Sequence, residues 1–315
     1  MIRIKTDKYN RNKDKQTNRF YRVEKKISVL VCLCVLIVLF PCFSYSQNTA
    51  EKDFEFIRYL IGNNMKEDAK TWAERDFLDK DYSHQSLDTI NFLRGWVFYS
   101  NRSLNKAVDM FDRVGDESGF KPSSVFFSSL SIAYEGEYKR AYSNLKEYED
   151  LLSPHSELYA FEQAGYSLLL RDFDSYEKYR ESFSYSSYIL SSKEKELDSI
   201  FLSVKSYKRK SPLLSACLSA IVPGLGKIYA GNLGEGISSF ITVGSFALIT
   251  TENWIRHGLG NWKTILFGTI GSVFYIGNIY GSYVSVKLNY DTFNEKQNIS
   301  ILYSIHIPLR NTFGL

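Results

Sequence analysis

The chain has 315 residues, of which 44% are hydrophobic and 16% aromatic, so it can build a sizeable core and is too apolar to be a disordered protein. Its net charge of +4 combines three segments of different sign: residues 1–26 carry +7, residues 47–207 carry −8, and residues 208–315 carry +5. Because the middle segment is acidic, we expect no nucleic acid partner.

The chain begins with a pattern typical of a secretory signal. A basic start is followed by fourteen uncharged apolar residues, 27–40, and then by Pro41 and the small-residue stretch CFSYSQ. This apolar run is short for a membrane-spanning helix, which needs about 20 residues. We therefore expect a signal peptide over residues 1–46, cleaved after Ser46. An uncleaved anchor is the alternative, because the basic start is unusually long, and in both cases residues 47 onward are exported.

Cysteine usage fits an exported chain without disulfides. Cys32, Cys34 and Cys42 lie in the signal segment, and Cys217 is the one cysteine that follows it. A single cysteine can form neither an intramolecular disulfide nor a cysteine-based metal site. We therefore expect the exported part to be held together by packing.

Residues 47–207 show self-similarity at the period of a helical repeat. Two stretches, which begin at Asn91 and Ser128, each read as a helix, a short turn and a second helix. The small residue of the second helix recurs at spacings of 38, 34 and 35 residues, at Ala69, Ala107, Ala141 and, in its place, Tyr176.

A unit of about 34 residues is the tetratricopeptide period. The stretch resembles that family over about residues 53–190, at the offsets of its small and aromatic packing residues: Gly95, Phe98, Ala107, Phe111, Gly136, Tyr138 and Ala141. The resemblance implies an α-solenoid of helix pairs. Small side chains let crossing helices approach and aromatic side chains fill the neighbouring space, so stacked pairs form a concave surface for a protein or peptide partner.

From residue 208 the chain becomes apolar, and residues 208–290 read as a small helical membrane domain. Three apolar segments follow one another, and the third, residues 264–286, has 23 residues without a charge, enough to cross a bilayer. The first is interrupted by Pro223 and Gly224, which is typical of a re-entrant or broken helix. Two or three crossings both fit; two return the tail, residues 291–315, to the exported side, and three leave it in the cytoplasm.

A glycine-rich stretch, IVPGLGKIYAGNLGEG, covers residues 221–236, but it lacks the spacing of a nucleotide loop. Gly226 and Lys227 are followed by Ile228, where a P-loop needs serine or threonine, and Tyr229 stands where a dinucleotide loop needs its third glycine. We therefore expect a structural hairpin turn, in which glycines let two apolar segments pack closely, and no cofactor.

Within this stretch, PGLGKIYAG resembles the Pro-Gly-x-Gly-x-x-Tyr-x-Gly signature of small bacterial membrane domains, similar in look to the TM2 type, that often follow an exported tetratricopeptide segment. Residues 275–290, YIGNIYGSYVSVKLNY, resemble the closing helix of that group and contain a GxxxG spacing, which allows close helix packing in lipid. The resemblance implies an envelope membrane protein. Its motif residues are Pro223, Gly224, Gly226, Tyr229, Gly231, Gly277 and Gly281.

The tail alternates apolar and polar residues over residues 298–309, NISILYSIHIPL, a pattern that predicts one strand. A single strand cannot close a barrel. An outer-membrane barrel is therefore disfavoured.

No motif predicts catalysis or metal binding. The histidines His84, His155, His257 and His306 are scattered, without the spacing of a metal-binding pair, and no serine lies in a nucleophile elbow. Clustered partners are what such chemistry needs. We therefore expect a protein that is not an enzyme and that holds no metal.

Two functions fit these features. The first is a non-enzymatic repeat scaffold, tethered to the bacterial inner membrane with its repeats in the periplasm, that binds an envelope protein or peptide. The second is a small transport or lipid-handling membrane unit regulated by its repeats. Transport of charged substrates normally leaves ionisable groups inside the spans, and residues 264–286 have none, so the scaffold is favoured.

Overall fold

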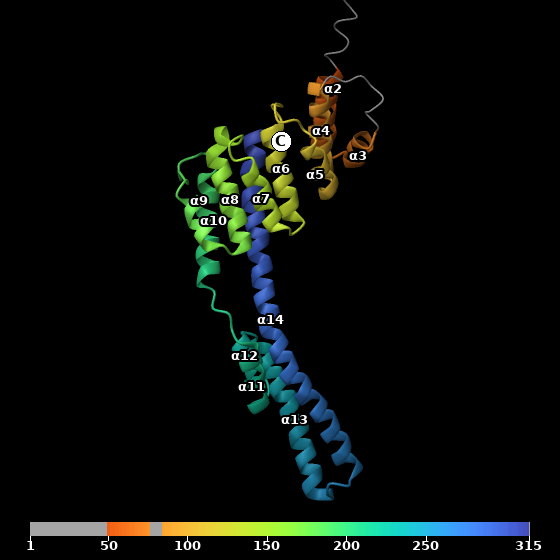
Figure 1. Cartoon of the computed structure of the whole chain (residues 1–315). Helices are drawn as coiled ribbons and strands as arrows, with labels where there is room; N and C mark the ends of the chain where they lie inside the picture. Colours follow the sequence, from red (N-terminus) through yellow and green to blue (C-terminus); the bar gives the residue numbers. More distant parts are fainter. Residues whose placement is uncertain (1–48, 76–83, 315) are drawn as a thin grey trace, which may run out of the picture. The chain divides into compact units, whose positions relative to one another are not determined.

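The computed structural model describes residues 49–75 and 84–314, which form α-helices, one short 3₁₀ helix and no strand (Figure 1). The all-α class expected from the sequence is confirmed. The expected signal peptide, residues 1–46, lies outside the described residues. The chain divides into two compact units, which meet between residues 131 and 132 within one helix.

The first unit contains two helix pairs and most of α6. Its helices are α2 (Thr49–Gly62), α3 (Lys66–Ala73), α4 (His84–Ser100), α5 (Leu104–Asp112) and α6 (Lys121–Tyr134). A Cβ on Gly95 of α4 would lie 2.6 Å from the Phe111 ring of α5. Glycine therefore lets that ring lie against the α4 backbone, and Phe98, Ala107 and Phe111 are all buried at this crossing.

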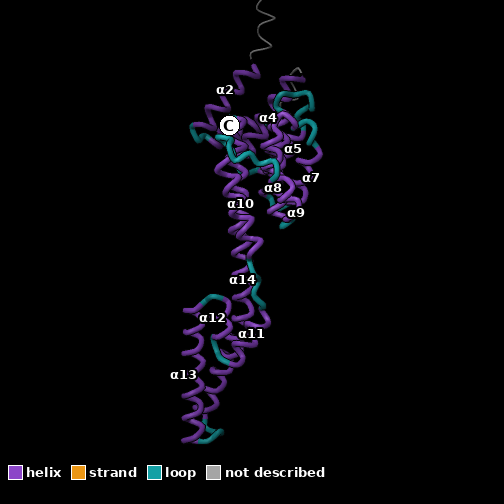
Figure 2. Tube along the Cα trace, turned by 90° about the vertical axis from the view of Figure 1, so that its left-hand side faces the viewer, coloured by secondary structure: helices purple, strands orange, loops and turns teal. Residues whose placement is uncertain are grey.

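The second unit contains the end of α6 and all later helices. These are α7 (Tyr138–Glu147), the 3₁₀ helix η1 (Ser153–His155), α8 (Ser156–Leu170), α9 (Phe173–Arg180), α10 (Ser191–Ser206), α11 (Pro212–Ile221), α12 (Leu225–Ala230), α13 (Leu233–His257) and α14 (Trp262–Phe313). Along α14, the first part packs with α11, α12 and α13 (Figure 2), and the second part packs with α8 and α10 (Figure 1). We call residues 212–290, with α11 to α13 and the first part of α14, the apolar hairpin.

The four helix pairs from α2 to α9 close with the same backbone turn. A residue in the left-handed region stands between the two helices of each pair, and these residues, 38, 34 and 35 positions apart, are Asn64, Arg102, Gly136 and Arg171. After each of them, the next N–H donates to the carbonyl five residues earlier, as in a Schellman C-cap. The spacing equals that of the fully buried positions Ala69, Ala107, Ala141 and Tyr176.

Residues 262–313 form one continuous helix, α14, whose 52 residues extend about 78 Å at 1.5 Å per residue. The strand expected over residues 298–309 is therefore wrong, and the tail, residues 291–315, is not a separate segment. Apolar residues lie at every second position of this stretch, which fits a strand. Residues three and four positions apart also lie on one face of a helix, so the same stretch fits a helix. The buried members of that face are Ile301, Leu302, Ser304, Ile305, Pro308 and Leu309.

The end of α14 completes the core around α8. Every residue from Leu158 to Leu169 is buried, because α7, α9, α10 and α14 all pack against α8. A Cβ on Gly165 of α8 would overlap Cγ2 of Ile305 on α14, so only glycine allows the observed approach. Arg171 Nη2 also donates to the side-chain oxygens of Asn294 and Asn298, at 3.0 and 2.9 Å.

Two helices of the described chain, α13 and α14, are long and apolar enough to cross a membrane, whereas α11 has only ten residues. Large apolar side chains are exposed along both, including Phe240, Ile241, Leu248, Ile265, Val273 and Ile276. Soluble proteins rarely expose such a continuous apolar surface. The later part of α14 contacts α8.

Candidate functional site

The PGLGKIYAG stretch forms α12 and the turns on both sides of it. Gly224, with φ of 85°, precedes α12, and Gly231, with φ of 114°, follows it. Glycine adopts these left-handed angles without strain. A Cβ on Gly224 would overlap the carbonyl oxygen of Gly236, and one on Gly226 would overlap that of Ser215. Backbone approaches on two sides therefore require these glycines.

Side chains accept hydrogen bonds from the backbone donors of the first turn. The N–H of Gly224 donates to Asn278 Oδ1 over 3.1 Å, and the N–H of Gly226 donates to Ser219 Oγ over 2.9 Å. A phosphate loop instead needs such N–H groups to converge on the anion. In this turn the two donors point into the protein and hold it against α11 and α14.

A buried polar cluster joins α11, α12 and α14. Ser215 Oγ lies 2.8 Å from the carbonyl oxygen of Gly226 and 2.9 Å from that of Ser282, and the hydroxyls of Ser219 and Ser282 lie 2.6 Å apart. Asn278 Nδ2 donates to the Ser219 carbonyl over 3.3 Å. A polar group left unpaired in an apolar region is costly, so a fully paired cluster fixes one arrangement of the three helices.

Tyr229 and Lys210 close the end of α12. The Tyr229 hydroxyl accepts from the N–H of Ser211 over 3.3 Å. Lys210 Nζ donates to the carbonyls of Tyr229 and Ala230, at 2.7 and 3.3 Å. Because a helix C-terminus carries partial negative charge, this ammonium group stabilises the short helix.

The two GxxxG glycines of α14 do not contact another helix backbone. A Cβ on Gly277 would meet nothing within 4 Å, and a Cβ on Gly281 would lie 3.5 and 3.8 Å from Cε and Nζ of Lys227. Gly281 therefore makes room for a lysine side chain. Gly277 lines a groove between α12, α13 and α14 that also includes Lys227.

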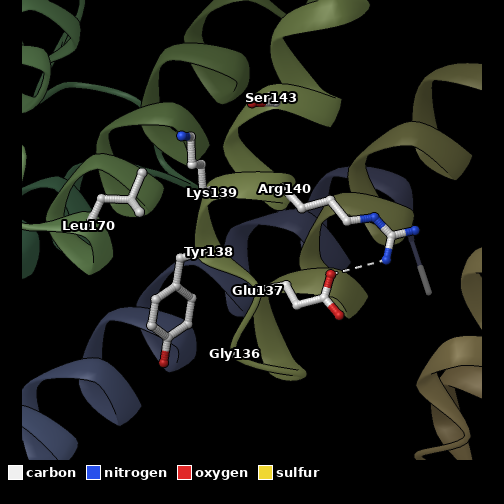
Figure 3. Close-up of a pocket in the computed structure, with 7 residues that line it drawn as sticks. All are labelled: Gly136, Glu137, Tyr138, Lys139, Arg140, Ser143 and Leu170. Atoms are coloured by element: carbon white, nitrogen blue, oxygen red, sulfur yellow. Dashed lines mark hydrogen bonds and ion pairs between the residues drawn. The ribbon is translucent and has the colours of Figure 1, made fainter.

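An open hollow of 570 Å³ lies at the turn before α7 (Figure 3). Its rim carries the ion pair between Arg140 and Glu137, 3.1 Å apart, and Leu170 provides an exposed apolar side chain. Charged and apolar side chains are commonly combined in a protein interface. The complete lining is Gly136, Glu137, Tyr138, Lys139, Arg140, Ser143 and Leu170.

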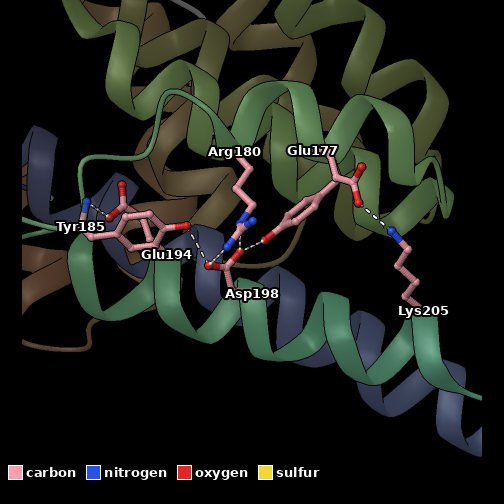
Figure 4. A network of polar contacts seen from close by, with 7 residues as sticks. Glu177, Arg180, Tyr185, Glu194, Asp198 and Lys205 are labelled. Atoms are coloured by element: carbon pink, nitrogen blue, oxygen red, sulfur yellow. Dashed lines mark hydrogen bonds and ion pairs between the residues drawn. The ribbon is translucent and has the colours of Figure 1, made fainter.

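A polar network joins α9 to α10 (Figure 4). Asp198 accepts from Arg180 Nε and Nη2 at 2.6 and 3.1 Å. It also accepts from the hydroxyls of Tyr176 and Tyr185, at 2.8 and 2.7 Å. Burial by itself raises the pKa of Asp198, but the hydrogen bonds from Arg180 and the two tyrosines outweigh it and lower the pKa below its usual value. A carboxylate occupied in this way fixes α10 in place and is a poor proton acceptor.

Glu162 is a fully buried carboxyl group on α8. Neither of its oxygens has a hydrogen bond of good geometry. Burial raises the pKa of Glu162 well above its usual value, and the nearby Tyr166 hydroxyl offsets this only in part. Burial therefore favours the protonated, uncharged form of Glu162 in the folded protein.

We expect the variant Glu162→Gln to be more stable than the parent protein, increasingly so as the pH rises. In the unfolded chain this glutamate ionises with a pKa of about 4.3. Above that pH, ionisation stabilises the unfolded state, whereas burial opposes ionisation in the folded protein. The parent loses about 1.4 kcal/mol per pH unit until the folded pKa is passed, whereas glutamine cannot ionise. Thermal unfolding of the full chain in detergent from about pH 5 to about pH 8 measures this difference.

The control is Glu147→Gln on the exposed side of α7, which removes a carboxyl group that is not buried. Its Tm difference from the parent should stay nearly constant over the same pH range. A Glu162→Gln difference that is equally independent of pH contradicts the buried, protonated state.

His155 and His306 each lie beside an aromatic side chain. His306 Nδ1 is 2.9 Å from the Tyr134 hydroxyl, and the His155 ring is 5.4 Å from the Phe313 ring. Burial, with a contribution from Arg310, lowers the pKa of His306. No group of three or more His, Cys, Asp or Glu side chains among the described residues is placed to hold a metal ion.

No protein-family model matches the chain, and neither a curated protein nor a solved structure matches it at a significant level. The features from which a function can be argued are therefore the apolar hairpin with its polar cluster, the hollow beside α7, and the long helix α14.

Proposed function

We propose that the chain is a membrane-tethered helical-repeat scaffold of the bacterial envelope, which binds a protein or peptide partner and catalyses no reaction. The observation that carries this proposal is the continuity of α14. Its first part belongs to the apolar hairpin, and its second part lies in the core formed with α8 and α10. A membrane anchor and a helical domain that share one helix are joined firmly.

The repeated turns support a tetratricopeptide-like solenoid. Four helix pairs share the left-handed turn residue and its spacing, and a fully buried side chain recurs at the same spacing. Such units bury their faces on their neighbours, so several together form an extended binding surface. An exported segment of this kind, followed by a small membrane domain with the PGLGKIYAG signature, is the arrangement that we propose.

Two crossings fit the charges at one end of the hairpin, whereas Lys208, Arg209 and Lys210 at its other end then lie on the exported side, where we propose that they contact lipid headgroups. Arg256, His257 and Lys263 flank the connection between α13 and α14, at the end of the hairpin remote from α8. Basic residues near short connections favour the cytoplasmic side. With this connection in the cytoplasm, the helix pairs and the end of α14 lie together in the periplasm.

The hollow beside α7 is the partner surface that we propose. It combines Leu170, an exposed leucine, with the opposed charges of Glu137 and Arg140. Another side of α8 is already covered by α14, so a partner helix cannot dock there without displacing Ile305 and its neighbours. A partner can bind in the hollow without displacing α14.

A photo-crosslinking amino acid at Ser143 tests this surface in the full chain. We expect one protein adduct, and we expect Leu170→Asp to remove it, because a charge replaces the apolar contact. The same crosslinker at Ser206, an exposed position on α10, is the matched control. Equal adducts at both positions, or none at Ser143, contradict the proposed surface.

Extraction of membranes with alkaline carbonate tests the tether separately. We expect the protein to stay in the membrane pellet, because about 20 apolar residues suffice to anchor a chain in a bilayer. Release into the supernatant contradicts the tether. This result does not depend on the identity of the partner.

A small transport or lipid-handling unit regulated by the helix pairs is the second candidate. The observation that favours it is a polar groove around Lys227 in the apolar hairpin. Ionisable residues inside a membrane region commonly mark a binding site or a path.

A further inference from the structure

The uncharged stretch of α14 ends at one boundary of the apolar hairpin. Residues 264–286 carry no charge, and Lys287 is the first charged residue after them. At 1.5 Å per residue these 23 residues extend about 34 Å, close to the roughly 30 Å of a bilayer's hydrocarbon core. When the hairpin spans a membrane, Lys287 therefore lies at the level of the lipid headgroups.

Two other segments meet α14 at this level. Asn289 Nδ2 donates to the Ala230 carbonyl and to Asn232 Oδ1, each over 3.2 Å. Lys210 Nζ donates to the same Ala230 carbonyl over 3.3 Å. The linker between α10 and α11 and the turn between α12 and α13 therefore lie at the same boundary as Lys287.

Two cations lie over tyrosine rings on one face of α14. The guanidinium carbon of Arg209 is 4.6 Å from the centroid of the Tyr290 ring, and Lys287 Nζ is 5.1 Å from that of the Tyr283 ring. Tyr283, Lys287 and Tyr290 share a helix face, because they are four and three positions apart. Cation–π contacts therefore hold both charged groups beside this face, and both residues are exposed.

Tyr207 fixes the linker that carries Arg209. Its ring stacks on that of Phe293, with the centroids 4.1 Å apart, and lies 5.8 Å from the Tyr290 ring. Contacts between aromatic rings are stabilising beyond the surface that they bury. Arg209 therefore reaches Tyr290 from a linker that is packed on α14.

Arg209 and Lys287 have no counter-ion in the described part of the chain. Neither forms an ion pair there, and Asp291, one turn after Lys287, is exposed and pairs with neither. Lys210 differs, because its ammonium group is bound to the end of α12. The ring below Arg209 is about 4.5 Å further along the helix axis than Lys287, so both cations can approach one anion. Guanidinium and ammonium groups form strong charge-assisted hydrogen bonds with phosphate.

The position of the two cations points to a phospholipid as the source of this phosphate. They lie just outside the uncharged stretch, which exposes apolar side chains such as Ile276 and Val284 against which an acyl chain can pack. Tyrosine rings are typical of the headgroup level of a membrane. A lipid whose chains contact the hairpin therefore presents its phosphate at the level of Arg209 and Lys287.

We propose that Arg209 and Lys287 together bind the phosphate of an anionic phospholipid, with the Tyr283 and Tyr290 rings at the headgroup level. This site rests on the membrane tether proposed above, and it adds the class of lipid that the tether prefers and the two residues that select it. A zwitterionic lipid also has a phosphate, but its own cationic group is repelled by the two cations of the site. The site therefore prefers lipids with a net negative charge.

Native mass spectrometry of the full chain, released from nanodiscs that contain equal amounts of phosphatidylglycerol and phosphatidylcholine, measures which lipid is retained. We expect phosphatidylglycerol to be enriched over phosphatidylcholine on the parent protein. Arg209→Gln and Lys287→Gln should each lower this enrichment about fivefold, the effect of one basic side chain near an anionic surface. Arg209→Lys keeps the charge and should keep most of the enrichment.

Lys296→Gln is the matched control, because it removes an exposed lysine from the same helix, nine positions after Lys287. This is about 14 Å along the helix axis, more than the screening length of about 8 Å at physiological ionic strength. We expect Lys296→Gln to keep the enrichment of the parent. Equal losses in Lys296→Gln and in the two site variants overturn the proposal, as does equal retention of both lipids by the parent.

Two further outcomes separate the lipid site from the tether and from free phosphate. A parent protein that enters nanodiscs without preferring either lipid overturns the site and leaves the tether intact, whereas one that does not enter nanodiscs contradicts the tether itself and the site with it. Inorganic phosphate, compared with chloride at the same ionic strength, should leave the enrichment unchanged. Loss of the enrichment in phosphate alone overturns the lipid as the source of the bound group.

Discussion

Gly224→Leu and Gly226→Leu are each expected to remove most of the folded apolar hairpin. At both positions a Cβ would overlap a backbone carbonyl, of Gly236 or of Ser215, and a backbone atom cannot move aside as a flexible side chain can. Gly224 also has φ of 85°, which a leucine adopts only with strain. The expected cost exceeds about 4 kcal/mol, a large share of the stability of a typical domain.

The yield of folded, detergent-resistant protein measures this effect. Gly244→Leu is the matched control, because it makes the same change on α13 where a Cβ meets nothing within 4 Å. We expect Gly244→Leu to give nearly the parent yield. A nucleotide-binding turn makes the opposite prediction: saturable binding of labelled ATP or NAD to the parent, lost in Gly224→Leu at unchanged yield.

The helix-pair spacing could be predicted from sequence because it depends on local signals. A small or aromatic side chain at a crossing and a turn between two amphipathic helices repeat at about 34 residues. The structure has left-handed residues at the same spacing, from Asn64 to Arg171. Two of the four are arginines, Arg102 and Arg171. Because glycine is the residue expected at a left-handed position, residue type does not predict these two. Arg171 is held there by its hydrogen bonds to α14.

The polar cluster of the hairpin was missed, although its signal is present in the sequence. Ser215 and Ser219, and likewise Asn278 and Ser282, are polar pairs four residues apart inside apolar segments. This spacing places each pair on one helix face. What the sequence cannot show is that the two faces meet, because the contacting residues of α11 and α14 are 59 to 67 positions apart in the chain.

The tail was predicted wrongly for a physical reason. Over residues 298–309 the apolar positions fit both a period of two and a helical face, and short stretches cannot separate the two. Tertiary packing on α8 and α10 decides in favour of the helix. Glu162 was missed for a similar reason, because a glutamate on a predicted repeat helix is normally solvent-exposed.

Ile305→Asp is expected to separate the end of α14 from α8. Ile305 is fully buried and fits against Gly165, so aspartate loses the apolar contact and places an unpaired charge beside α8. Removal of a buried isoleucine side chain costs about 2–5 kcal/mol, and the unpaired charge adds to this. The total is enough to release this part of α14 while the hairpin part stays folded, since the two parts pack against different helices.

Trypsin cleavage and thermal unfolding of the full chain in detergent measure this release. Lys296 and Arg310 lie on the docked part of α14 and are already exposed, but cleavage requires the helix to open locally, which is easier once it is released from α8. Ile299→Asp is the matched control, because it makes the same change on the same helix at a side chain that is 61% exposed. We expect faster cleavage and a lower Tm for Ile305→Asp only. Equal behaviour of the two variants would mean that α14 is not docked on α8, and the single helix could then no longer be the rigid link between membrane anchor and scaffold.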